Sequence, residues 1–178
     1  MKGSRVASRY AAALLELSIE QNTVEVIRKD MDQLLSICKN SRDFLAMLKS
    51  PVINPHKKND LYERIFGASM HKLSLAFMKL ITKNAREKFL PEIATSFVSQ
   101  HKTYKNIVEV YVTSATTLDT GAKEKILAKV RQSIKGTLEV YEEVDEKLIG
   151  GFVVRIDDMQ IDASIRNQLK NLNQILLN

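Results

Sequence analysis

The stretch LIGGFVVRIDDMQID, residues 148–162, decides how the last part of the chain folds. Phe152, Val154 and Ile156 alternate with Val153 and Arg155, which is the period of two expected of a strand with one buried face. The two aspartates at 157–158 have short side chains that tolerate the backbone angles of a tight turn, so residues 159–161 can return as a second strand. The stretch therefore predicts a β-hairpin.

A final helix is expected directly after this hairpin. Asp162 has the short carboxylate typical of a helix N-cap, where it accepts a hydrogen bond from a free backbone N–H of the first turn. The apolar residues beyond it recur at helical spacing and form one stripe, made of Ile165, Leu169, Leu172 and Leu176. This end of the chain therefore predicts strand, turn, strand and helix.

Two further strands are expected upstream of the hairpin. Residues 107–115 (IVEVYVTSA) alternate valines with polar residues, and residues 138–144 (LEVYEEV) read as a second strand. Asp119 can cap a helix between them that ends near Gly136. We expect residues 106–178 to form a small α/β domain in which helices cover a roughly four-stranded sheet.

The first 105 residues show only helical periods. Six helices with short connections are expected, at about 4–20, 24–39, 44–48, 54–66 and 70–83, with a long sixth helix ending near Tyr104. Such a segment predicts a compact all-α bundle. The fold class of the chain is therefore α+β, with a six-helix N-terminal domain at 1–105 and a C-terminal α/β domain at 106–178.

The fourth helix, at 54–66, shows a simple amphipathic pattern. Pro55 suits its first turn. Leu61, Ile65 and Phe66 are expected to point inward, whereas the two lysines at 57–58 are expected to lie on a solvated face.

The helices at 4–20 and 70–83 differ from the others because their apolar residues cover more than one side. One set of stripes consists of Val6, Tyr10, Ala13 and Leu17 on the first helix and Leu73, Phe77 and Leu80 on the fifth. A second set consists of Ala7, Ala11, Leu14, Leu15 and Ile19 on the first helix and Leu75, Met78 and Ile81 on the fifth. A helix of this kind is either fully buried or packs on the core with one face and on a partner with the other.

Composition excludes several classes of protein. Of 178 residues, 44% are hydrophobic and 27% charged, as in ordinary globular proteins. No apolar run approaches the roughly 20 residues of a membrane span. Cys38 is the only cysteine, so neither an intrachain disulfide nor a cysteine-based metal cluster is possible, and a small apolar filler on a helix is its simplest role.

The sequence does not point to an enzyme. The three histidines lie on three separate elements without an HExxH motif, and no phosphate-binding glycine loop is present. Asp157, Asp158 and Asp162 could be drawn as a cation site, but their positions suit turn and cap residues without a metal. We therefore expect no catalytic residue, metal or cofactor.

Charge distribution leaves one alternative open. Residues 1–105 carry 18 Lys and Arg against 10 Asp and Glu, a net charge of +8, while residues 106–178 carry 9 against 11, a net charge of −2. A basic helical domain can bind nucleic acid, so an RNA-binding bundle of the antiterminator type is the alternative function. The lysines, however, are scattered over many helices and the chain has no tryptophan, which favours a solubilising surface.

Three motifs resemble one family, the delta subunits of F-type ATP synthases, called the oligomycin-sensitivity-conferring protein in mitochondria. These are ASRYAAALLELS at the start, KNAREKFLPEI before the sixth helix, and the C-terminal signature. The signature residues are Gly150, Gly151, Phe152, Val153, Arg155, Asp158, Asp162, Ser164 and Arg166. Asp157 departs from the family, in which many members have glycine, although aspartate tolerates a positive φ.

The resemblance implies a non-catalytic stator subunit that links the alpha/beta head of the synthase to the peripheral stalk. It also implies that the bundle receives the N-terminal helix of an alpha subunit between its first and fifth helices, and that the C-terminal domain meets subunit b. The partner-binding residues are then expected on one of the two sets of stripes, namely Tyr10, Ala13, Leu17, Leu73, Phe77 and Leu80. Plain core packing of the same residues remains the alternative.

Location follows from these partners. The protein is expected to be monomeric on its own and peripheral in the complex, at the cytoplasmic face of a bacterial membrane, since no organelle presequence is evident.

Overall fold

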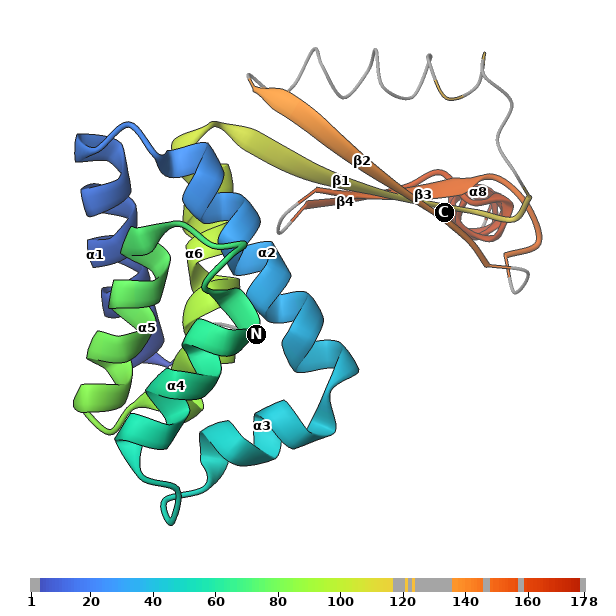
Figure 1. The fold of residues 1–178 in the computed structure, drawn as a ribbon. Coiled ribbons are helices and arrows are strands. Elements are labelled where there is room, and N and C mark those ends of the chain that lie inside the picture. The colour runs from blue at the N-terminus through green and yellow to red at the C-terminus, as the bar shows by residue number, and fades with distance from the viewer. Residues whose placement is uncertain are drawn as a thin grey trace. The chain divides into compact units, whose positions relative to one another are not determined.

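The computed structural model describes residues 4–116, 121, 123, 136–145, 148–156 and 159–176, with the backbone alone at several positions of the last helix. The chain divides into two compact units, Met1–His101 and Lys102–Asn178. The first unit is helical and the second contains a sheet, which confirms the predicted α+β class (Figure 1). None of the described helices is long and apolar enough to cross a membrane.

Six α-helices build the first unit, as predicted. They are α1 (Arg5–Glu20), α2 (Val24–Asn40), α3 (Arg42–Lys49), α4 (Pro55–Phe66), α5 (Lys72–Lys83) and α6 (Leu90–Tyr104), with a short 3₁₀ turn at Glu87–Phe89. Side chains of Ser4, Ser41, Asn54 and His71 accept a backbone N–H at the starts of α1, α3, α4 and α5. These caps satisfy N–H groups that have no partner within the helix, and they determine where the four helices begin.

The prediction of which residues of α4 face the core is wrong in part. Phe66 is fully buried, but Leu61 and Ile65 are 37% and 41% exposed. The buried row is Lys58, Tyr62 and Phe66, which recur every four residues and therefore lie above one another on one side of the helix.

Lys58 lies in the interior although a solvated position was predicted. Its ammonium group donates to the carboxylate of Glu87 at 2.6 Å and to the carbonyl oxygen of Ser50 at 2.7 Å. A charge without such partners would be costly to bury. The hydroxyl of Tyr62 likewise lies 3.1 Å from that of Thr82, and burial is the main cause that raises the pKa of Tyr62 to about 12. Hydrogen-bond partners that are distant in sequence thus allow Lys58 and Tyr62 to occupy the inner face of α4 instead of its leucine and isoleucine.

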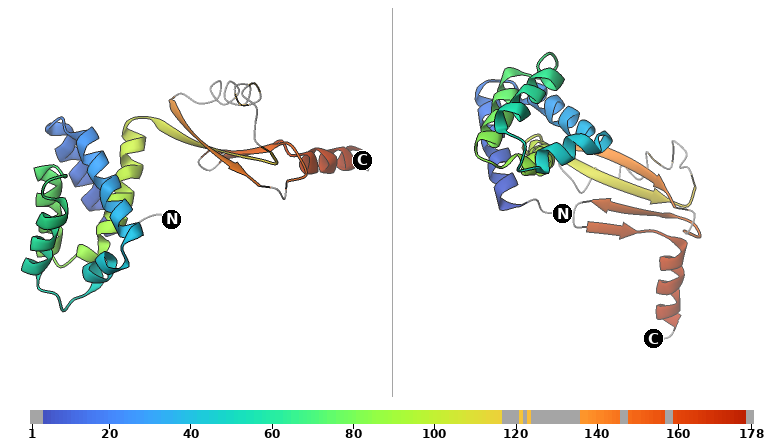
Figure 2. Two further views of the ribbon diagram at one scale, coloured as in Figure 1. Left: turned by 45° about the vertical axis from the view of Figure 1, so that its right-hand side comes forward. Right: turned by 60° about the horizontal axis from the view of Figure 1, so that its bottom comes forward.

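One mixed four-stranded sheet forms the second unit (Figure 2). Its strands are β1 (Ile107–Ser114), β2 (Thr137–Val144), β3 (Phe152–Ile156) and β4 (Met159–Asp162), in the order β2-β1-β3-β4. β1 is parallel to β2 and antiparallel to β3, and β3 is antiparallel to β4. The helix predicted between Asp119 and Gly136, apart from residues 121 and 123, and the turn at 157–158 lie outside the described residues.

The last helix, α8 (Ile165–Leu176), starts later than expected because Ser164 rather than Asp162 caps it. The hydroxyl of Ser164 accepts the N–H of Asn167 at 3.3 Å. Asp162 closes the preceding turn instead, where its carboxylate accepts the N–H of Ser164 at 2.9 Å. Hydrogen bonds from Ser164 lower the pKa of Asp162.

The two faces of the sheet differ in character. Val110, Val112, Val154 and Ile156 are buried on one face. On the other face the rings of Tyr111 and Tyr141, which are register partners, stack with 5.1 Å between centroids. The second face is therefore a polar and aromatic surface.

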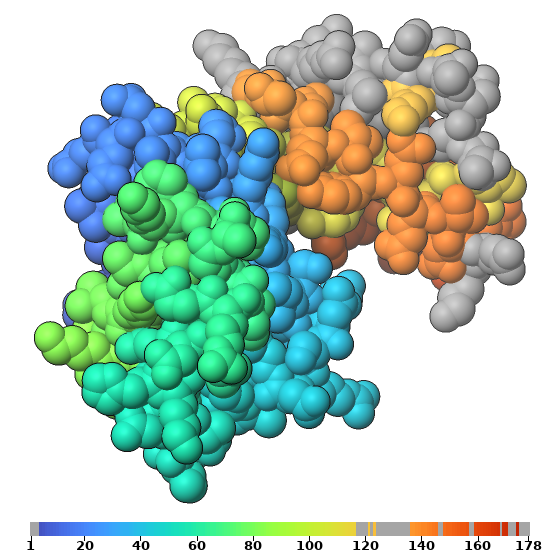
Figure 3. Space-filling view, viewed as in Figure 1, coloured from blue at the N-terminus to red at the C-terminus, as the bar shows by residue number. Residues whose placement is uncertain are grey.

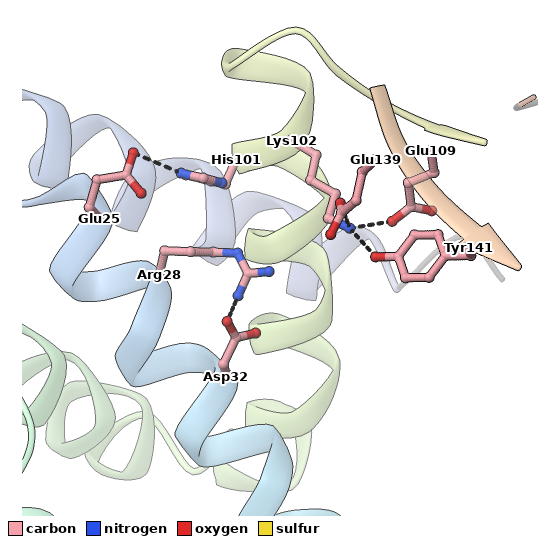
Figure 4. Close-up of polar contacts among 8 residues, drawn as sticks. All are labelled: Glu25, Arg28, Asp32, His101, Lys102, Glu109, Glu139 and Tyr141. Carbon is pink, nitrogen blue, oxygen red and sulfur yellow. Dashed lines mark hydrogen bonds and ion pairs between the residues drawn. The ribbon is translucent and has the colours of Figure 1, made fainter. Parts of the chain in front are cut away.

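The last three residues of α6 belong to the second unit, and among them Lys102 contacts the polar face (Figure 4). Its ammonium group pairs with Glu109, lies 2.6 Å from Glu139 and donates to the hydroxyl of Tyr141 at 3.1 Å. Partial burial alone would lower the pKa of Lys102, but these hydrogen bonds raise it above its usual value. The bond from Lys102 in turn lowers the pKa of Glu109. This cluster fixes the side chains on the polar face.

Candidate partner-binding surface on helices α1 and α5

Exposure distinguishes the two sets of apolar stripes on α1 and α5. The buried residues of α1 are Ala7, Ala11, Leu14, Leu15 and Ser18, and those of α5 are Ser74, Leu75, Phe77, Met78, Ile81 and Thr82. Of the six residues predicted to bind a partner, only Phe77 is buried, and the other five are at least partly exposed. Core packing accounts for the other set of stripes.

The six predicted residues lie at three levels of exposure. Leu17 and Leu80 are 42% and 49% exposed, and Ala13 is exposed as well. Tyr10 and Leu73 are half-buried and pack on the core. Phe77 is only 7% exposed. We call these six side chains the α1/α5 surface, in which Phe77 contributes the floor and the other five contribute the outer part.

Direct contacts tie the two helices together at one end of the α1/α5 surface. The rings of Tyr10 and Phe77 meet edge to face with their centroids 6.4 Å apart. The hydroxyl of Tyr10 accepts from the side chains of Asn84 and Arg86, each at 3.4 Å. The first half of α1 therefore lies beside the end of α5, as Figure 1 also shows for the blue and green helices. Blue and green atoms adjoin in the space-filling view (Figure 3).

Asp30 on α2 holds the start of α5 in place. Its buried carboxylate accepts the hydroxyl of Ser74 at 2.5 Å and the backbone N–H of His71 at 2.9 Å. A carboxylate is favourable at this position because the N–H groups and the dipole of the helix point at it. This role could not be predicted from local sequence, since Asp30 is more than 40 residues away from both partners.

Small side chains bring the core faces of the two helices close to their neighbours. Ala7 and Ala11 on α1 and Ser74 on α5 are fully buried. The buried hydroxyl of Ser18 donates to the carbonyl oxygen of Leu15 at 2.7 Å, and that of Thr82 donates to Met78 at 3.0 Å, so neither requires water. The bundle can therefore bury one side of each helix while leaving the α1/α5 surface open.

The α1/α5 surface has the chemistry of a binding site and not of a catalytic site. Its members are four aliphatic side chains, one phenylalanine and one tyrosine, none of which is paired with a nucleophile or a base. Among the described residues no group of three or more histidines, cysteines or carboxylates could hold a metal ion. Asp157 and Asp158 lie outside these residues. An apolar strip with partly exposed leucines is suited to the apolar side of another helix.

The second unit also exposes apolar side chains near its sheet edge. Met159 and Ile161 on β4 are 60% and 54% exposed, and Ile165 and Leu169 on α8 are exposed as well. β4 is an edge strand with β3 as its one partner in the sheet. These four residues, called the β4/α8 patch, are a second set of candidate contact residues.

Comparison with known proteins gives a consistent result. The sequence profile of the family described as "ATP synthase delta (OSCP) subunit" matches residues 6–176. A protein of Cytophaga hutchinsonii named "ATP synthase subunit delta" is 34% identical over 176 residues, which cover 96% of this chain and 95% of that protein. A protein of the same name from Chlorobaculum parvum is 34% identical over 179 residues, covering 99% and 98%.

Similarity to a solved structure supports the fold. A chain in the cryo-EM structure of the Toxoplasma gondii mitochondrial ATP synthase hexamer superposes with a TM-score of 0.72 at 17% identity, covering 98% of this chain and 99% of that one. At this identity the likeness concerns the arrangement of helices and strands.

Proposed function

Because the chain belongs to the ATP synthase delta (OSCP) subunit family, we propose that its α1/α5 surface holds the N-terminal helix of an alpha subunit. The chain is a non-catalytic stator subunit of an F-type ATP synthase. The comparisons give no support to the RNA-binding alternative, which rested on the positive charge and the helical fold of the N-terminal domain.

The observation that carries the proposal is the exposure of Leu17 and Leu80 on helices that are already packed on the core with another side. A surface helix normally turns its polar side to water. α1 and α5 instead leave leucines, Ala13 and the edge of Tyr10 available. A partner helix with an apolar stripe would cover these residues and remove them from water.

We likewise propose that the β4/α8 patch contacts subunit b of the peripheral stalk. Met159, Ile161 and the exposed residues of α8 offer apolar contacts to a helical end of the stalk. The stator would then be held through both units of the chain. Attachment at two sites raises the effective concentration at each, so neither contact has to be extremely tight.

Rotation sets a demand on the alpha contact, because a stator that dissociates uncouples proton flow from synthesis. Nanomolar affinity corresponds to about −12 kcal/mol. An interface of standard size, which buries roughly 1,600 Å², can reach this value if it is well packed. The complex would place the protein at the cytoplasmic face of a bacterial membrane without inserting it.

Calorimetric titration of the full chain tests the proposal. The probe is a synthetic peptide with about the first 20 residues of the cognate alpha subunit, a length of about 30 Å when helical. We expect saturable one-to-one binding that persists at high salt, because apolar burial dominates it. Absence of peptide binding, together with RNA binding that falls steeply with salt, would refute the proposal and restore the alternative.

A further inference from the structure

One end of the α1/α5 surface carries positive charges that form no ion pair among the described residues. Arg86 is exposed, and its guanidinium carbon lies 5.7 Å from the centre of the Tyr10 ring. Arg9 and Lys83 are exposed on α1 and α5, next to Tyr10 in sequence and at the end of α5. The ion pairs found among the described residues include none of these three cations.

Other cations of the same unit do have acidic partners. Lys58 pairs with Glu87, Lys79 pairs with Glu63, and Arg28 pairs with Asp32. Arg86 instead donates one bond to a neutral tyrosine hydroxyl at 3.4 Å. Most of its five N–H donors therefore remain available for another acceptor.

Docking of a helix on the α1/α5 surface would take water away from this end. A guanidinium that loses water without gaining an acceptor makes binding less favourable. A carboxylate on the docked helix would compensate through two parallel hydrogen bonds, the geometry to which a guanidinium is suited. The Tyr10 ring already holds Arg86 at the edge of the surface, so little side-chain freedom would be lost on binding.

From these observations we propose that Arg86, held by Tyr10, receives an acidic side chain of the docked helix and thereby sets its direction and register. The proposal rests on the function proposed above, because it concerns the same surface. Arg9 and Lys83 add to the positive potential at this end, whereas Glu16 and Glu20 are exposed in the second half of α1. A helix docked the wrong way round would place its carboxylate near those glutamates.

The test is a double-mutant cycle with the full chain and the alpha-subunit peptide. Each acidic residue of the peptide is replaced in turn by its amide, and affinity is measured by calorimetry for the unsubstituted chain and for Arg86→Gln. We expect one acidic position to matter, with affinity about threefold to tenfold weaker when it is neutralised. The same peptide change should have no further effect in Arg86→Gln.

A matched control is Arg64→Gln, which removes one exposed positive charge from α4 in the same unit. It should leave both the affinity and the effect of the peptide substitution unchanged. The peptide substitutions do not alter the protein, so this half of the test is independent of how Arg86→Gln folds.

Two results would overturn the inference while leaving the proposed function intact. One is tight peptide binding in which no acidic position matters, and the other is an acidic position whose effect is equally large in Arg86→Gln. Failure of the unsubstituted chain to bind the unsubstituted peptide would overturn the proposed function and the inference together.

Discussion

The ring of Tyr10 meets the ring of Phe77 edge to face, with their centroids 6.4 Å apart, although Tyr10 is half-exposed and Phe77 is buried. This pair connects the α1/α5 surface with the core beneath it. A substitution on the surface can therefore act through binding, through folding or through both, depending on its depth. Substitutions at exposed and at buried residues of the α1/α5 surface can therefore distinguish effects on binding from effects on folding.

Ala13→Asp should weaken binding of the alpha-subunit peptide at least about tenfold, because it would bury a charge in an apolar contact. Since Ala13 is exposed, the free energy of unfolding should change by less than about 1 kcal/mol. Calorimetry and urea denaturation measure the two quantities. Ala46→Asp, the same change at an exposed position of α3, should leave binding intact. Equal binding by both variants would show that Ala13 lies outside the contact.

Phe77→Ala should lower the free energy of unfolding by about 3–5 kcal/mol, because it removes a buried ring and leaves a cavity. Leu80→Ala should lower it far less, since Leu80 is 49% exposed. Urea denaturation of the two variants checks the difference. If Leu80→Ala were as destabilising as Phe77→Ala, Leu80 would belong to the core and not to the outer part of the surface.

Lys58→Met should lower the free energy of unfolding by about 3 kcal/mol, because the carboxylate of Glu87, whose side chain is only 13% exposed, loses the ammonium group 2.6 Å away. The pair of Lys79 with Glu63 is largely exposed, so Lys79→Met is the control and should cost less than about 1 kcal/mol. The comparison requires only denaturant titrations. A small effect of Lys58→Met would mean that water reaches Glu87 when the lysine is absent.

Cys38 should make folding sensitive to alkaline pH. Burial raises the pKa of its thiol from 9.0 to about 11. The unfolded chain therefore loses this proton at a lower pH than the folded one, so stability falls as the pH rises from about 9 to 11. The thiol should also react slowly with alkylating reagents at pH 8 unless the protein is unfolded. Cys38→Ala should have a flatter pH dependence of stability, and an equal slope would contradict this assignment.

Gly150 and Gly151 should respond differently to alanine. Gly151 has a φ of +81°, and an added Cβ would collide with the carbonyl oxygen of Ala163. The backbone conformation alone costs about 1–2 kcal/mol for an alanine. At Gly150 the Cβ would meet the end of the Ile165 side chain, which is 41% exposed and can rotate away. Thermal denaturation should therefore show a large loss for Gly151→Ala and a small one for Gly150→Ala.

Local signals explain which parts of the fold could be predicted. Ser41 and Asn54 cap the helices that follow them, and Pro55 occupies the first turn of α4. The alternation of side chains in residues 107–114 indicates β1. Periodicity and helix caps can both be recognised from the sequence, because they depend on residues that are near neighbours in the chain. The exposed stripes of α1 and α5 were also visible as apolar residues on a second side.

Partners distant in sequence account for what could not be predicted. The burial of Lys58 could not be predicted, because its partner Glu87 lies 29 residues further along the chain. The bond between Asp30 and Ser74 likewise joins residues that are 44 positions apart. The parallel pairing of β1 with β2 and the contact of Arg86 with Tyr10 likewise depend on tertiary structure. Sequence periodicity reports which side of a helix is apolar, but not which polar groups find partners inside.

The strand order has a consequence for how the chain is made on the ribosome. β1 lies in the middle of the sheet, yet it is synthesised before both of its neighbours, β2 and β3. Until those strands emerge, a nascent chain with a finished helical unit presents β1 with both edges unpaired, and such edges can pair with other chains. Translation that stalls between β1 and β3 would therefore release a product prone to aggregation, even though its helical part can already fold.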